Sequence, residues 1–204
     1  MTLLIRESLS NTVQLFVMIA LSALMLVMAP RAENRTAAWI MTGGFLCAMM
    51  GNLFWSLYIL LRKETPPYFS ASDIAWIGSY CFFVASYKVT FPQREKVPWT
   101  AHIPAATVLC NIPIWIWYSG GHIAQNLIWG AALTMFAFYT GEALYRTRDM
   151  DRALRMRAMA QMLFLTAELL LFVSYGSAYY IFDFIVTAAY IALALTFVRK
   201  RSAA

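Results

Sequence analysis

Long apolar runs alternate with short polar connections along the whole chain, and this alternation limits the folds that the sequence can adopt. A helix that crosses a bilayer needs about 20 apolar residues. Prolines, glycines and basic residues divide the chain into seven runs close to that length. The sequence therefore predicts seven transmembrane helices, at about residues 11–29, 37–61, 73–91, 100–118, 123–145, 158–175 and 178–198.

The composition favours the same fold class. The 204 residues are 61% hydrophobic and 13% charged, whereas a soluble domain is about half apolar and about a quarter charged. We therefore expect an all-α, polytopic membrane protein in which residues 1–204 form a single seven-helix domain. The net charge of +6 arises from basic residues between the apolar runs, so the expected partner is the lipid bilayer and not nucleic acid.

The distribution of Lys and Arg predicts the orientation of the chain. If the chain crosses seven times, one side carries only Arg6, Arg62 and Lys63. Because cytoplasmic loops are enriched in Lys and Arg, we expect an outside N-terminus and a cytoplasmic C-terminus. The residues that fall on the cytoplasmic side are Arg31, Arg35, Lys88, Arg94, Lys96, Arg146, Arg148, Arg152, Arg155, Arg157, Arg199, Lys200 and Arg201.

Small residues and prolines indicate how the helices pack. Gly43, Cys47 and Gly51 recur every four residues in the second run, which places a smooth ridge on one face and predicts a close helix–helix contact. Pro104 and Pro113 predict kinks in the fourth run.

Two carboxylates interrupt the apolar stretch TAELLLFVSYGSAYYIFDFIV, which begins at Thr166. A tight turn near Gly176 divides this stretch into two antiparallel helices, and Glu168 and Asp183 are almost equally distant from the turn. At ~1.5 Å per residue, each lies about 10 Å below the outer end of its helix. Whether the two side chains face each other depends on helix rotation.

Four further polar or aromatic side chains, Asn52, Asn111, Tyr80 and Trp76, reach a comparable depth. If they point inward, the outer half of the bundle contains a polar and aromatic ligand-binding pocket with the two acids as its floor. Two acids favour a cation, an amine or a proton. The alternative is a set of buried hydrogen bonds that only hold the helices together.

The sequence lacks the residues that several kinds of catalytic or cofactor chemistry require. His102 lies at the cytoplasmic start of the fourth run and His122 in an outer loop, so the two histidines are far apart in depth. The sequence contains no C-x-x-C, G-x-S-x-G, P-loop or dinucleotide fingerprint. The seventh run has no lysine that could carry a retinal Schiff base. We therefore expect no metal, no cofactor and no catalytic residue, although two carboxylates alone can perform acid–base chemistry.

Residues 52–83 read NLFWSLYILLRKETPPYFSASDIAWIGSYCFF. Two prolines end one helix, and the spacing of Ser70 and Asp73 is that of a capping box at the start of the next. This stretch resembles the N-terminal membrane regions of bacterial diguanylate cyclases and sensor histidine kinases, with Ser72 in place of the usual Ala. The matching residues are Trp55, Pro66, Pro67, Ser70, Asp73, Trp76 and Tyr80.

The resemblance implies a multi-pass sensory module of the bacterial inner (plasma) membrane. In that family an output domain follows the last helix, whereas this sequence ends at Ala204, so we expect a separate cytoplasmic signalling protein as the partner. The leading hypothesis is a non-enzymatic ligand-binding module. The alternatives are a small transporter or intramembrane enzyme that uses Glu168 and Asp183, and a structural subunit of a membrane assembly.

Overall fold

A computed structural model of the chain describes residues 2–67, 69–91, 96–119, 123–148, 150, 152–174 and 177–198, with only the backbone described at 2–8, 118–119, 177–178 and 198. These residues form α-helices and two short 3₁₀ helices, with no strand among them, in agreement with the predicted all-α class. Several positions named in the sequence analysis lie outside the described residues: Arg94, His122, Gly176, Arg199, Lys200 and Arg201.

The described helices agree in number with the apolar runs. Their order is α1 (Thr2–Met28), η1 (Ala29–Arg31), α2 (Arg35–Arg62), α3 (Ala71–Thr90), η2 (Trp99–His102), α4 (Ile103–Ser119), α5 (Ile123–Arg146), α6 (Arg152–Phe172) and α7 (Ser177–Val198). α4 begins only at Ile103, so Pro104 lies in its first turn, where proline is tolerated, and Pro113 alone lies inside the helix.

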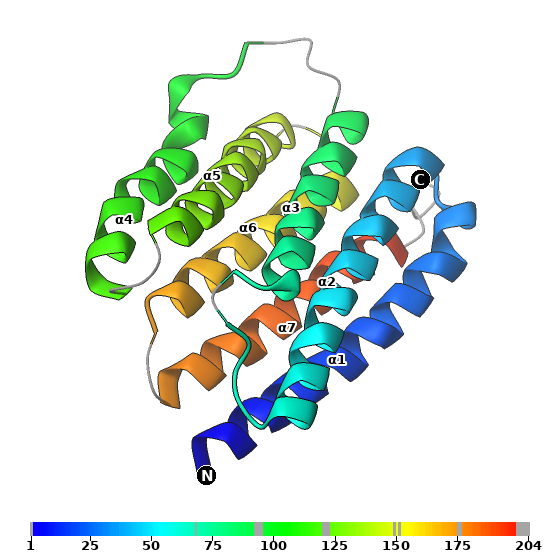
Figure 1. Cartoon of the computed structure of the whole chain (residues 1–204). Helices are drawn as coiled ribbons and strands as arrows, with labels where there is room; N and C mark the ends of the chain where they lie inside the picture. The colour runs from blue at the N-terminus through cyan, green and yellow to red at the C-terminus, as the bar shows by residue number, and fades with distance from the viewer. Residues whose placement is uncertain are drawn as a thin grey trace.

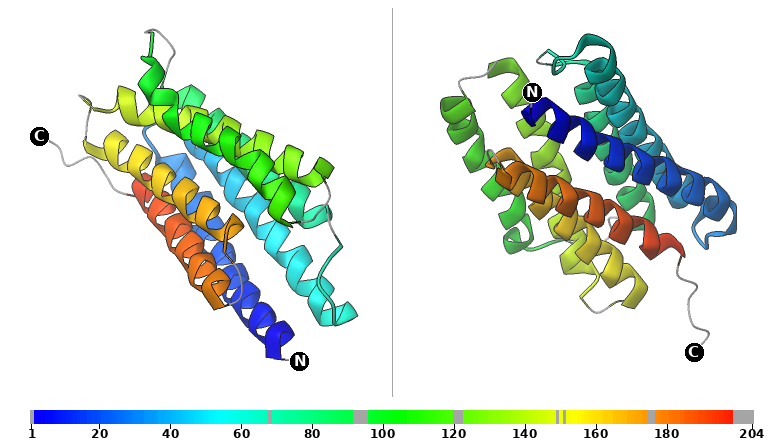
Figure 2. Two further views of the ribbon diagram at one scale, coloured as in Figure 1. Left: turned by 90° about the vertical axis from the view of Figure 1, so that its left-hand side faces the viewer. Right: turned by 90° about the horizontal axis from the view of Figure 1, so that it is seen from below.

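Six of the helices form a closed ring. α1 packs on α2, α2 on α3, α3 on α5, α5 on α6, α6 on α7, and α7 returns to α1 (Figures 1 and 2). α4 lies outside this ring, against α5. Successive helices run in opposite directions, so α1, α3, α5 and α7 all begin at one end of the bundle (Figure 2). We call this end the N-terminal end.

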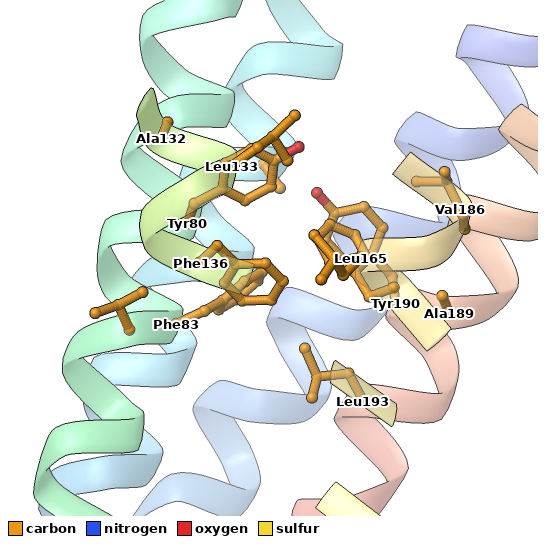
Figure 3. Packing of buried hydrophobic residues seen from close by; sticks show 14 of the residues in the cluster. Tyr80, Phe83, Ala132, Leu133, Phe136, Leu165, Val186, Ala189, Tyr190 and Leu193 are labelled. Carbon is orange, nitrogen blue, oxygen red and sulfur yellow. The ribbon is translucent and has the colours of Figure 1, made fainter. Parts of the chain in front are cut away.

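Aromatic side chains fill the middle of the ring. Phe83 and Phe164 meet edge to face with centroids 5.9 Å apart, and Phe164 meets Tyr190 at 4.6 Å. Tyr80 stacks on Phe136 at 5.6 Å. All five rings are at most 3% exposed, and Figure 3 shows Tyr80, Phe83, Phe136 and Tyr190 packed in the space between the helices. The ring is therefore a packed core.

The outer surface of the bundle is also apolar. Every helix carries large hydrophobic side chains on its exposed face, for example Phe16 in α1 at 67%, Leu109 in α4 at 57% and Ile181 in α7 at 61%. A soluble protein rarely exposes so much apolar area, whereas lipid tails cover it without cost. Within the described residues, four helical segments are long and apolar enough to cross a membrane: Leu9–Arg31, Arg35–Arg62, Ile123–Arg146 and Tyr179–Phe197.

The contact between α2 and α3 uses the small residues noted in the sequence. A Cβ atom added to Gly43 would lie 2.8 Å from the Phe82 ring, and one added to Gly51 would lie 2.7 Å from the Trp76 indole. The predicted ridge on α2 is thus a helix–helix contact, and α3 is its partner. This close approach fixes the rotation of α3.

The corner between α2 and α3 is built as the sequence indicates. Lys63 ends α2 in the left-handed conformation, with φ of 61°, and its N–H donates to the carbonyl of Ile59. Ser70 and Asp73 form the predicted capping box at the start of α3.

Candidate functional site

Glu168 of α6 and Asp183 of α7 lie on neighbouring helices, and both are buried, at 7% and 6% exposure. They are close enough for the charge of Asp183 to act on Glu168. Glu168 is four residues from the end of α6 and Asp183 is six residues from the start of α7. Both carboxylates therefore lie in the half of the bundle nearer the N-terminal end.

Asp183 is held by side chains of α1. The hydroxyl of Ser10 donates to Oδ2 of Asp183, and Nε2 of Gln14 donates to Oδ1 at 3.2 Å. Gln14 also donates to Oγ1 of Thr187 at 3.1 Å. These bonds connect α1 to α7 where the ring closes, and all of these side chains are buried.

Glu168 has neighbours on the opposite side of the ring. The hydroxyl of Tyr80 in α3 lies near its carboxylate. Tyr190 of α7 lies close enough to both acids for their charges to act on its hydroxyl, and the hydroxyl of Ser79 lies nearby. Figure 3 shows the hydroxyl groups of Tyr80 and Tyr190 directed into the same region between their helices. The two acids and these partners thus link α1, α3, α6 and α7. We call Ser10, Gln14, Ser79, Tyr80, Glu168, Asp183, Thr187 and Tyr190 the polar cluster.

Tryptophans lie beside the polar cluster toward the N-terminal end. Trp129 of α5 meets Tyr80 edge to face at 5.8 Å. Trp76 lies 6.4 Å from Trp129 and 5.6 Å from Trp55, centroid to centroid. Because Trp76 is half-buried whereas Tyr80 is 1% exposed, this aromatic group covers the approach to the acids from the N-terminal end.

The two asparagines identified in the sequence have different positions. Asn52 is 1% exposed; its Nδ2 donates to the carbonyl of Ala48 at 3.0 Å, and its Oδ1 has no hydrogen-bond partner among the described residues. Asn111 lies on α4, outside the ring, half-buried, and donates to the carbonyl of Thr107 in its own helix at 2.7 Å. The structure therefore brings Trp76, Tyr80, Asn52, Glu168 and Asp183 to one half of the interior, without Asn111.

Five members of the polar cluster were not identified from the sequence: Ser10, Gln14, Ser79, Thr187 and Tyr190. Ser10 and Gln14 are four residues apart, which places them on one face of a helix, and this spacing was the available signal. Asp73, interpreted only as a helix cap, also accepts a hydrogen bond of 2.9 Å from Nε1 of Trp129. The capping box thereby ties α3 to α5 next to the polar cluster.

Another buried acid, Glu142 of α5, lies near the opposite end and has different neighbours. The hydroxyl of Tyr87 donates to its Oε2 at 3.3 Å, and Tyr87 is also hydrogen-bonded to Arg146. Glu142 thus has a positive charge close by. By contrast, every described contact of Glu168 and Asp183 is with a neutral or acidic side chain.

This arrangement can bind positive charge. The Asp183 carboxylate accepts bonds from Ser10 and Gln14 and is well oriented. Neutral neighbours do not cancel the charge of either acid, and burial in an apolar bundle makes an uncancelled charge costly. A proton or a small cation would cancel it. No family model, curated protein or solved structure matches the chain.

Proposed function

We propose that the chain is a membrane-embedded sensory module that binds a proton or a small cation, such as a protonated amine, between Glu168 and Asp183. One observation carries the proposal: two carboxylates that are close enough for their charges to interact are buried in the ring among neutral polar side chains, with no described basic partner. Trp76, Tyr80 and Asn52 supply aromatic and polar contacts on the side of the N-terminal end.

The polar cluster also supports a route for the signal. Its hydrogen bonds join α1 to α7, and Tyr80 of α3 lies near Glu168 of α6, so a change in the charge of either acid changes contacts among four helices at once. A ligand shifts a conformational equilibrium only through different contacts in the two states. A cluster shared by four helices meets that requirement, because a movement of any of them alters the bonds to the acids.

Packing on the far side of the polar cluster favours sensing over transport. Phe83, Phe136 and Phe164 are at most 1% exposed and fill the ring between the acids and the opposite end. A transporter needs alternating access from both sides of its site. A closed aromatic core on one side is instead suited to a site that is reached from the N-terminal end alone.

The proposed topology has seven crossings, with the N-terminal end outside the inner (plasma) membrane and the C-terminus in the cytoplasm. It is supported by the alternating direction of the helices (Figure 2) and by the Lys and Arg bias of the sequence. The similarity of residues 52–83 to membrane regions of diguanylate cyclases and sensor histidine kinases supports the sensory role. A separate cytoplasmic signalling protein then receives the signal.

The test is a binding measurement on the purified full chain in lipid nanodiscs. Thermal unfolding is followed at several pH values and with sodium, potassium, methylammonium or tetramethylammonium added, since a ligand that binds the folded state raises the melting temperature. We expect a response to pH or to one cation that is lost in Glu168→Gln and in Asp183→Asn. The matched control is Glu142→Gln, which neutralises a buried acid outside the polar cluster and should keep the response.

The other hypotheses give different results in the same preparation. A structural subunit would show lower melting temperatures in both variants but no ligand response in any protein, which would contradict the proposal. A transporter would move the stabilising cation into proteoliposomes, and the wild-type flux measurement detects this directly. A response that persists in both acid variants would exclude these carboxylates as the binding groups.

A further inference from the structure

The connection between α5 and α6, at the end of the bundle opposite to the polar cluster, contains a depression with a volume of about 700 Å³. Its walls are formed by three arginines and three methionines: Arg148, Met150, Arg152, Arg155, Met156 and Met159. None of these residues takes part in the polar cluster, so an inference about this depression is independent of the proposed cation site.

The three arginines come from the end of α5 and the start of α6. Arg148 lies just after α5, while Arg152 and Arg155 lie in the first turn of α6, and all three side chains are exposed. Nη2 of Arg155 donates to the carbonyl of Arg148 at 2.5 Å, which closes the connection and holds that guanidinium in place. Guanidinium groups arranged in this way recognise phosphate through paired hydrogen bonds.

The surrounding charge is positive overall. Residues 146–157 include five arginines and two aspartates, Asp149 and Asp151, which lie outside the described residues. The stretch therefore keeps a net charge of +3 when both acids are ionised. The first N–H groups of α6 also point toward this end, and they favour an anion.

The methionines continue the same surface along α6. Arg152, Arg155, Met156 and Met159 are spaced i, i+3, i+4 and i+7, so they share one face of the helix. Met159 is 58% exposed and lies about 6 Å further along the helix axis than Arg155. A surface that changes from guanidinium to thioether over one turn, next to apolar helices, has the polarity profile of a phospholipid.

We propose that this depression binds the phosphate headgroup of an anionic phospholipid, with Arg148, Arg152 and Arg155 at the phosphate and Met159 against an acyl chain. A free phosphate would use the arginines alone. An acidic protein segment would not require an apolar contact at the depth of Met159. The methionine face therefore favours a lipid over both.

The test is native mass spectrometry of the purified full chain, titrated separately with phosphatidylglycerol, phosphatidylcholine and inorganic phosphate. We expect phosphatidylglycerol to be retained preferentially. The double variant Arg152→Gln/Arg155→Gln should lower its apparent affinity on the order of tenfold, the effect expected from losing charge-assisted hydrogen bonds. The matched control Arg31→Gln/Arg35→Gln removes two exposed arginines near the same end of the bundle and should keep the wild-type affinity.

Two further variants separate the loss of lipid contacts from other effects of the substitutions. Arg152→Gln alone leaves the bond from Arg155 to Arg148 intact, so a loss of lipid in this variant does not stem from an opened connection. Met159→Ser should weaken phosphatidylglycerol and leave inorganic phosphate unchanged. Equal retention of phosphatidylcholine, equal effects of the test and control pairs, or binding of inorganic phosphate as tight as that of the lipid would each overturn the proposal.

Discussion

The indole N–H of Trp129 donates a hydrogen bond of 2.9 Å to Oδ1 of Asp73. The other oxygen of the same carboxylate caps α3 by accepting bonds from the N–H and the hydroxyl of Ser70, at 2.7 Å and 3.0 Å. The side chain of Asp73 therefore caps the start of α3, at the end of the corner that follows α2, and also holds α5 against α3.

Trp129→Phe tests that link, because the phenyl ring keeps most of the packing and loses only the donor. A hydrogen bond to a charged group contributes about 1.5–3 kcal/mol, so we expect a fall of that size in the free energy of unfolding, measured by denaturation in mixed micelles. Trp117→Phe is the control, since Trp117 is 89% exposed. Equal stability of the two variants would show that the bond does not hold α5 to α3.

The α2–α3 contact predicts different effects of an alanine substitution at two glycines, Gly44 and Gly78. A Cβ atom on Gly44 would overlap the ring of Phe83, which is fully buried and cannot move aside. Overpacking of this kind costs about 1–3 kcal/mol, so Gly44→Ala should lower the melting temperature clearly. A Cβ atom on Gly78 would lie 3.6 Å from Sγ of Cys47, an ordinary contact. Gly78→Ala should therefore leave the melting temperature nearly unchanged. A decrease in melting temperature equal to that of Gly44→Ala would contradict the packing described for α2 and α3.

The bond between Gln14 and Asp183 should couple α1 to α7 energetically. Gln14→Leu keeps the approximate volume but removes the donor to both Asp183 and Thr187. In a double-mutant cycle with Asp183→Asn, contacting residues show a coupling of about 0.5–3 kcal/mol. The coupling is calculated from the free energies of unfolding of the wild type, the two single variants and the double variant. Additive effects would mean that the contact contributes nothing to stability.

The seven-crossing topology predicts which connections a membrane-impermeant maleimide can reach. In a background with Cys47, Cys81 and Cys110 replaced by alanine, Glu64→Cys should react in intact cells. Arg31→Cys and Lys96→Cys should react only after permeabilisation, because each is separated from Glu64 by one crossing. Labelling of all three positions from the same side would exclude crossings by α2 and α3.

Much of the fold could be predicted because its signals are local. The apolar runs, the two prolines after α2 and the capping box of Ser70 and Asp73 act within a few residues, so helix number and the α2–α3 corner follow from the sequence. The depth of Glu168 and Asp183 follows as well, since distance along a helix is proportional to residue count. Some helix starts were predicted less accurately. α1 begins at Thr2 and α6 at Arg152, before the apolar runs at about 11 and 158, and α4 begins only at Ile103 because η2 takes up the residues before it.

The sequence by itself determined an all-helical chain, the order of its apolar segments and the level of its buried acids. Only the tertiary structure decided which faces point inward. Asn52 and Asn111 are the same residue type at similar depth, yet one is buried in the ring and the other lies on α4 outside it. Helix rotation depends on contacts between distant segments, such as Gly51 against Trp76 and Ser10 against Asp183. No local pattern specifies those contacts, because they exist only once all the helices have packed.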